Sequence, residues 1–121
     1  MADQKSQQEV VLVENETGSI TGSDMSSGRN RGIVVYIDVI TAGGGDVTVT
    51  VQRKSPVSTD EYEDLGASAA VSAEGLTTLT IYPGIGETAN VSISDVIGAM
   101  FRINAAVSGT ITYSIGYALI P

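Results

Sequence analysis

Residues 34–55 read VVYIDVITAGGGDVTVTVQRKS, and this stretch decides the fold class. In the run 33–40 the odd-numbered residues are all isoleucine or valine, so they share one face of an extended chain. The run 47–54 alternates valine with threonine in the same way, which is typical of an antiparallel sheet with one face in water. We therefore predict that the two runs form a β-hairpin whose turn is the glycine-rich segment 42–46.

The rest of the chain repeats this pattern of short apolar runs separated by glycine and polar turns. Segment 99–121 predicts a second hairpin with its turn at Ser108-Gly109, and segment 69–87 predicts a β pair around Glu74-Gly75. Segment 88–98 fits either a short strand or one helical turn. Additional strands are expected at 9–13, around Ile20 and at 62–65. Seven or eight strands predict an all-β protein, a single antiparallel β-sandwich of jelly-roll or immunoglobulin-like topology with an extended N-terminal arm.

The chain of 121 residues has the length of one domain. We assign residues 1–16 to an N-terminal arm with a short strand, and residues 17–32 to a polar loop rich in Gly, Ser, Asn and Asp. Residues 33–121 form the predicted β-sandwich domain.

Composition narrows the chemistry that this chain can perform. There is no histidine and no cysteine, so the usual general base, thiolate metal sites and disulfides are absent. We expect no enzymatic activity, no metal and no cofactor. The formal net charge of −8 disfavours nucleic-acid binding, because it repels phosphate backbones. No apolar run reaches the length of a membrane-spanning helix, and the polar N-terminus lacks a secretory signal, so we expect no membrane partner and folding in a cytoplasm.

Two short segments carry the candidate contact residues. Arg29 and Arg31 lie in the polar loop, where their charge opposes that of the chain as a whole, and guanidinium groups bind carboxylates in pairs. The N-terminal arm contributes Gln4, Lys5 and Gln7, and a polar arm of this kind can become ordered on binding. We predict that both segments contact a partner protein.

Two other groupings have a functional and a structural interpretation. The cluster Asp60, Glu61, Glu63 and Asp64 could bind Ca²⁺ or act as an acid–base pair, but we favour a charged strand edge that discourages aggregation. The tyrosines could form a sugar-binding platform, but we favour packing roles in the core and at sheet edges. They are Tyr36, Tyr62, Tyr82, Tyr113 and Tyr117.

Three segments together resemble small virion proteins of tailed bacteriophages. They are GIVVYIDVITAGGGDVTVTVQRKSP, YEDLGASAAVSAEGLTTLTIYPGI and FRINAAVSGTITYSIGYALIP, which span most of residues 32–121. The likeness is one of strand pattern, without a signature motif. Residues 1–31 lie outside it.

The resemblance implies a structural protein on the exterior of a phage particle. We expect a capsid decoration, or cement, protein that binds the major capsid protein on the outer surface of the head and stabilises the shell. It would act as a homo-oligomer, with a trimer as one form, located in the virion after assembly in the host cytoplasm. The alternatives are a tail-tube, tail-tip or head-fibre component, and a carbohydrate-binding or adhesin module.

Overall fold

The computed structural model describes residues 9–57 and 61–121, and these residues are all-β. They form ten strands and no helix. The strands are β1 (Glu9–Glu16), β2 (Ile20–Thr21), β3 (Met25–Ser26), β4 (Gly32–Thr41), β5 (Asp46–Lys54), β6 (Tyr62–Ala67), β7 (Gly75–Ile81), β8 (Ser92–Ile93), β9 (Met100–Ser108) and β10 (Thr112–Ile120). The count exceeds the expected seven or eight because β2, β3 and β8 are two-residue strands.

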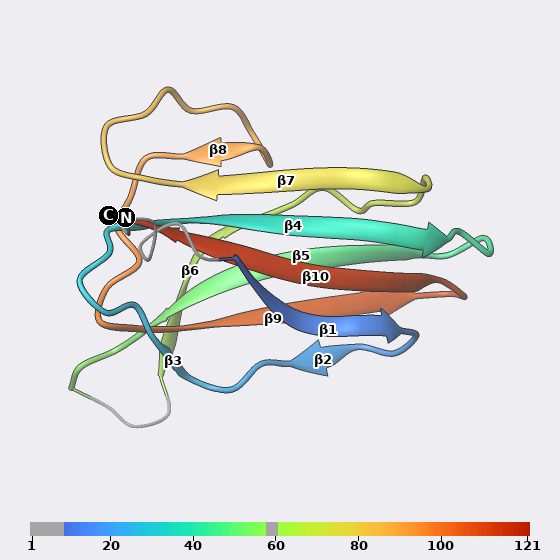
Figure 1. The fold of residues 1–121 in the computed structure, drawn as a ribbon, viewed down its shortest axis with the longest axis horizontal. Helices are drawn as coiled ribbons and strands as arrows, with labels where there is room; N and C mark the ends of the chain where they lie inside the picture. The colour runs from blue at the N-terminus through green and yellow to red at the C-terminus, as the bar shows by residue number, and fades with distance from the viewer. Residues whose placement is uncertain (1–8, 58–60) are drawn as a thin grey trace, which may run out of the picture.

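The strands form two sheets that face each other across one apolar core. The first sheet has the order β1-β10-β4-β7-β8, and the second has the order β2-β9-β5-β6, with β3 also paired to β9. All pairings are antiparallel except that of β7 with β8. The long strands run along the longest axis of the molecule (Figure 1). The predicted all-β class is confirmed, and the two sheets are mostly antiparallel.

The period-two patterns correctly predict which side chains are buried. The inward-facing valines of β5 are fully buried, and the even-numbered residues between them are only partly buried. The odd-numbered residues from 33 to 39 on β4 and from 101 to 105 on β9 are buried in the same way. The core includes Ile33, Val35, Ile37, Val39, Val47, Val49, Val51, Leu79, Ile81, Phe101, Ile103, Tyr113 and Ile115. Leu76 of β7 is apolar, but it is 64% exposed, because it lies on the outer face of the first sheet.

The hairpin predicted for residues 33–54 is wrong. Strand β4 pairs with β10 and β7 in the first sheet, while β5 pairs with β9 and β6 in the second. The connection at 42–45 is therefore an arch from one sheet to the other. Facing sheets lie about 10 Å apart, and four residues can span that gap. A short loop between two alternating runs therefore does not distinguish an arch from a hairpin.

The other two predicted pairings are wrong for the same reason. Strands β9 and β10 lie in opposite sheets, so the turn at Ser108-Gly109 is also an arch. Around Glu74-Gly75 the preceding segment does not pair with β7. Val71 forms an isolated bridge with Val47 of the second sheet, whereas β7 pairs with β4 of the first. Of the two alternatives for segment 88–98, the structure shows a short strand, β8, and not a helical turn.

The two arches pack backbone to backbone, and this close approach explains their glycines. The Gly45 amide donates to the Thr110 carbonyl at 2.9 Å. A Cβ on Gly45 would collide with the Ser108 carbonyl oxygen and would lie 2.5 Å from the Thr110 nitrogen. A Cβ on Gly109 would lie 2.9 Å from the Gly45 Cα. Only glycine fits where these two arches touch.

We expect Gly45→Ala to lower the free energy of unfolding by about 2 kcal/mol, because a methyl group forced against backbone atoms costs as much as overpacking a core. Gly86→Ala is the matched control, since a Cβ there has no neighbour within 4 Å, and its effect should stay within about 0.5 kcal/mol. Urea denaturation of both variants measures the difference. Equal stabilities would contradict the packing of the arches.

The N-terminal part of the described chain is built into both sheets. Strand β1 pairs with β10 from Glu9, opposite Ala118, to Glu16, and it forms the edge of the first sheet. Segment 17–32 then crosses to the second sheet, where β2 and β3 both pair with β9. The expected short strand around Ile20 is present as β2. Most of the expected polar loop is thus held by the fold, and its last turn, 27–31, remains at one end.

Candidate partner-binding end

One end of the molecule gathers the loops that carry the predicted contact residues. We call it the loop end, and it consists of residues 27–31, 53–57, 94–100 and Pro121. The Ser27 hydroxyl donates to the Gly98 carbonyl at 2.5 Å, and the Arg31 amide donates to the Ile120 carbonyl at 2.8 Å. The opposite end, which we call the arch end, carries the arches at 42–45 and 108–111.

Arg29 and Arg31 lie on the turn 27–31 of the loop end. The Asn30 amide donates to the Ser27 carbonyl at 3.1 Å and closes the turn, in which Gly28 has a φ of 64°. Both arginines are exposed, and neither forms an ion pair with any carboxylate of the described residues. The Arg31 guanidinium lies 5.7 Å from the centroid of the Tyr82 ring. Two guanidinium groups thus project from an ordered turn with their hydrogen-bonding capacity available.

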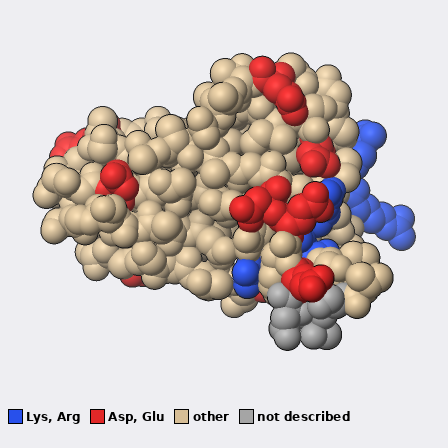
Figure 2. Space-filling model, turned by 180° about the vertical axis from the view of Figure 1, so that it is seen from behind, with Lys and Arg blue, Asp and Glu red and all other residues tan. Residues whose placement is uncertain are grey.

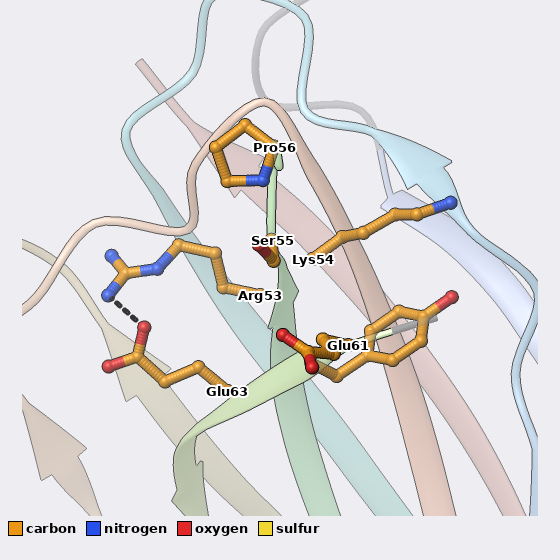
Figure 3. A pocket seen from close by; sticks show the side chains of 7 residues that line it. Arg53, Lys54, Ser55, Pro56, Glu61 and Glu63 are labelled. Carbon is orange, nitrogen blue, oxygen red and sulfur yellow. Dashed lines mark hydrogen bonds and ion pairs between the residues drawn. The ribbon is translucent and has the colours of Figure 1, made fainter. Parts of the chain in front are cut away.

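Arg53, by contrast, is neutralised within the fold. Its guanidinium donates to Glu63 of the edge strand β6 at 2.8 Å (Figure 3). It also donates to Asp95 at 3.3 Å. The hydrogen bond to Glu63 is the main reason why the pKa of Arg53 is raised above its ordinary value. Figure 3 shows Arg53 and Lys54 pointing to opposite sides of β5, as period two requires.

Lys54, Asp24 and Tyr62 meet on the outer face of the second sheet. The Lys54 ammonium donates to one oxygen of Asp24 at 2.6 Å, and the Tyr62 hydroxyl donates to the other at 2.7 Å. These two hydrogen bonds, in that order, lower the pKa of Asp24 below its ordinary value. The Arg102 guanidinium lies 3.5 Å from the centroid of the Tyr62 ring. Together these contacts fasten the segment before β3 to strands β5, β6 and β9.

A glutamine orders the polar side chains beside this cluster. The side-chain amide oxygen of Gln52 accepts hydrogen bonds from the side chains of Arg102 at 2.7 Å and Asn104 at 2.9 Å. Its amide group donates to Asp64 at 2.6 Å. Glu63 and Asp64 thus lie on the edge strand β6 and contact side chains of the neighbouring strand β5. This agrees with the charged strand edge that we favoured over a Ca²⁺ or acid–base site. Asp60 lies outside the described residues.

Protonation of Asp24 is expected to release the segment that contains β3. Because the folded-state pKa is lowered, the contribution to stability is present above the ordinary value of 3.8 and is lost as pH falls through the lower folded-state pKa. Amide hydrogen exchange at Met25 should accelerate over that acidic window. Asp24→Asn should accelerate the same exchange already at neutral pH. Asp38→Asn, an identical charge change at an exposed site, should leave it unaltered, and a similar acceleration there would contradict the assignment.

The five tyrosines do not share a surface. Tyr113 and Tyr117 are buried in the core. Tyr36 lies on β4, Tyr62 lies on the outer face of the second sheet, and Tyr82 donates to the Pro121 carbonyl at the loop end. The packing roles that we favoured are confirmed for Tyr113 and Tyr117. The five tyrosines therefore do not form a shared platform.

Sequence reasoning finds only part of this end. It singles out Arg29 and Arg31, which the fold places on one turn, whereas Gln4, Lys5 and Gln7 lie outside the described residues. It misses Asp24, because the partners of Asp24 are 30 and 38 residues away in the chain. Lys54 ends one strand and Tyr62 begins the next, and nothing in their local sequence indicates that both contact Asp24.

Within residues 9–57 and 61–121, no group of three or more acidic residues is placed to hold a metal ion. The same part of the chain contains no helix long and apolar enough to cross a membrane. A scan against protein-family models finds no match for this chain. A search of the curated proteins finds no match either.

Proposed function

We propose that this chain is a structural virion protein, a decoration or cement protein that binds the outer surface of a tailed-phage head and stabilises it. The proposal rests on the resemblance of residues 32–121 to small phage virion proteins and on one structural observation. Two exposed arginines, Arg29 and Arg31, project from an ordered turn and form no ion pair with the carboxylates of residues 9–57 and 61–121, in a chain whose net charge is −8. Exposed, unneutralised guanidinium groups are suited to carboxylates on a partner surface.

Within this proposal the fold is a jelly roll. Its two sheets, β1-β10-β4-β7-β8 and β2/β3-β9-β5-β6, have consecutive long strands that mostly alternate between sheets, as the arches require. Viral capsid and lectin domains both use this architecture. The fold alone does not choose between these functions. Because the tyrosines form no platform, no observation favours the carbohydrate-binding alternative.

The proposal assigns no catalysis to the chain. Without histidine or cysteine, its serines lack the usual base. A decoration protein needs a stable scaffold and a contact surface, and it stabilises a shell by binding only the assembled form. Many copies on one lattice would turn weak individual contacts into firm attachment. Homo-oligomers, including a trimer at a three-fold position, belong to this proposal.

Glu9, the first residue that the structure describes, lies opposite Ala118 near the end of β10, toward the loop end. A chain of eight residues can reach at most about 28 Å from that point. The proposal therefore keeps Gln4, Lys5 and Gln7 as contact residues beside Arg29 and Arg31.

The test is the copy number of this protein, measured by quantitative mass spectrometry on purified particles against the major capsid protein. A ratio near one to one is the expected result for a protein that covers the head lattice. A handful of copies would instead favour a tail-tip or head-fibre component, and rings or polymers of the isolated protein would favour a tail tube. Absence from purified particles would overturn the proposal.

A further inference from the structure

The cations, but not the carboxylates, are confined to one end along the long axis of the molecule. Carboxylates lie at both ends, and Glu63 and Asp95 pair with Arg53 at the loop end. All five cations of the described residues belong to the loop end or to strand positions near it. They are Arg29, Arg31, Arg53, Lys54 and Arg102. Figure 2 shows blue atoms gathered at one end of the visible face and projecting beyond the tan surface there. Red atoms lie among the blue ones there, whereas at the other end of that face the only coloured atoms are red.

Among the described residues, the charged side chains at the arch end are all carboxylates. Asp46 begins β5 directly after the arch at 42–45. Glu74 contacts the same arch, where its carboxylate accepts a hydrogen bond from the Ala42 amide at 3.4 Å. Glu16 lies opposite Tyr113 near the start of β10. Glu14 and Asp38 lie in the same half of the molecule, on β1 and β4. No ion pair among the described residues neutralises any of these five.

The loop end also offers apolar surface next to its arginines. A hollow of about 310 Å³ lies between the end of β5 and the start of β9, and its walls include Pro56, Gly98 and Met100. Met100 is 36% exposed, and Val57 on the adjacent loop is 91% exposed. Interfaces commonly combine such an apolar centre with a polar, charged rim.

We propose that the loop end is the docking end, which binds a carboxylate-rich protein surface and accepts one of its apolar side chains beside Pro56 and Met100, while the arch end points away from the partner. This inference deepens the proposed function and rests on it. Arg29 and Arg31 supply the attraction. The acidic arch end opposes docking in the reverse orientation, because like charges repel the same carboxylate-rich surface.

Such a charge distribution steers the approach of the protein as well as its final contact. Complementary potentials raise the rate of association, and salt weakens the effect because the Debye length is only about 8 Å at physiological ionic strength. Binding should therefore weaken with salt despite the net negative charge of the chain.

The first test measures binding to purified heads assembled without this protein. Arg29→Gln/Arg31→Gln should weaken binding by about tenfold and should reduce its salt dependence, as expected for the loss of two exposed ion pairs. Thr41→Glu/Ser72→Glu, at exposed positions of the arch end, changes the net charge by the same two units and should bind like the unmodified protein. An equal loss in both variants would overturn the inference, since net charge alone would then explain it.

The second test reads the orientation directly, because the chain contains no cysteine of its own. Val57→Cys marks the loop end and Ser72→Cys marks the arch end, both at exposed positions. On saturated heads, maleimide labelling of the Val57→Cys protein should slow by at least tenfold, while labelling of the Ser72→Cys protein should keep its solution rate. The reverse pattern, or no protection at either site, would overturn the inference and leave the decoration proposal intact. Failure of the unmodified protein to bind heads would overturn both.

Discussion

Replacing Phe101 with alanine is expected to lower the free energy of unfolding by about 4 kcal/mol, the typical cost of removing a buried aromatic ring. Phe101 lies on β9 of the second sheet and is fully buried. Its ring meets Tyr117 of the first sheet edge to face, with centroids 5.8 Å apart and planes at 85°. Truncation would remove apolar contacts, leave a cavity and break this aromatic pair. Domains of this size are typically stable by only about 5 to 15 kcal/mol, so the variant would lose a large share of its stability.

Urea denaturation is the measurement, with Phe101→Leu as the matched control. Leucine keeps most of the buried volume, so this variant should lose less than about 1.5 kcal/mol. A double-mutant cycle with Tyr117→Leu isolates the ring contact, whose coupling should be about 1 kcal/mol. A loss below 2 kcal/mol for Phe101→Ala would contradict the position of this side chain between the two sheets.

The Phe101–Tyr117 contact also shows what the sequence does and does not predict. Alternation predicts the inward direction of both side chains, because burial depends on the local period of each strand. It does not predict that their strands belong to opposite sheets. Consecutive strands are neighbours in about two-thirds of cases, and this expectation produced the three wrong pairings. The arches became evident only through non-local contacts such as that of Gly45 with Thr110.

A similar limit applies to the candidate site. Arg29 and Arg31 were predictable because they lie in a long polar loop and their charge opposes that of the acidic chain. The hollow beside Pro56 and Met100 joins two segments separated by more than 40 residues, and its walls form only when β5 and β9 pair. Local sequence also does not show that Arg53 is neutralised, because Glu63 and Asp95 reach it from other elements.

High pH is expected to destabilise the protein through Tyr113. This side chain is fully buried, and its hydroxyl donates to the Gly18 carbonyl at 2.6 Å. Burial, with a smaller contribution from the charge of Glu16, raises the pKa of Tyr113 to about 12. In the unfolded chain the hydroxyl titrates near 10. Between these two values the folded state holds a proton that the unfolded state has lost, so stability is complete below pH 10 and falls as pH rises toward 12.

The free energy of unfolding should drop by about 2 kcal/mol across this window, since each unit of pKa difference corresponds to about 1.4 kcal/mol and the loss is still incomplete at pH 12. Urea denaturation at pH values from 9 to 12 measures the drop, and absorbance near 295 nm follows tyrosinate formation. Tyr117, whose pKa is also raised by burial, adds a contribution of the same sign. The comparison with Tyr113→Phe therefore isolates the Tyr113 contribution.

Tyr113→Phe should be less stable than the unmodified protein at pH 8, by about 1 kcal/mol, because the Gly18 carbonyl loses its donor. Phenylalanine does not titrate, so the variant should lose less stability than the unmodified protein as pH rises. The difference between the two proteins should therefore shrink above pH 10 and reverse its sign before pH 12. A constant difference across the window would mean that Tyr113 ionises as readily in the folded state as in the unfolded chain. Its hydroxyl would then be open to water, and segment 17–19 would not close over the core at the arch end.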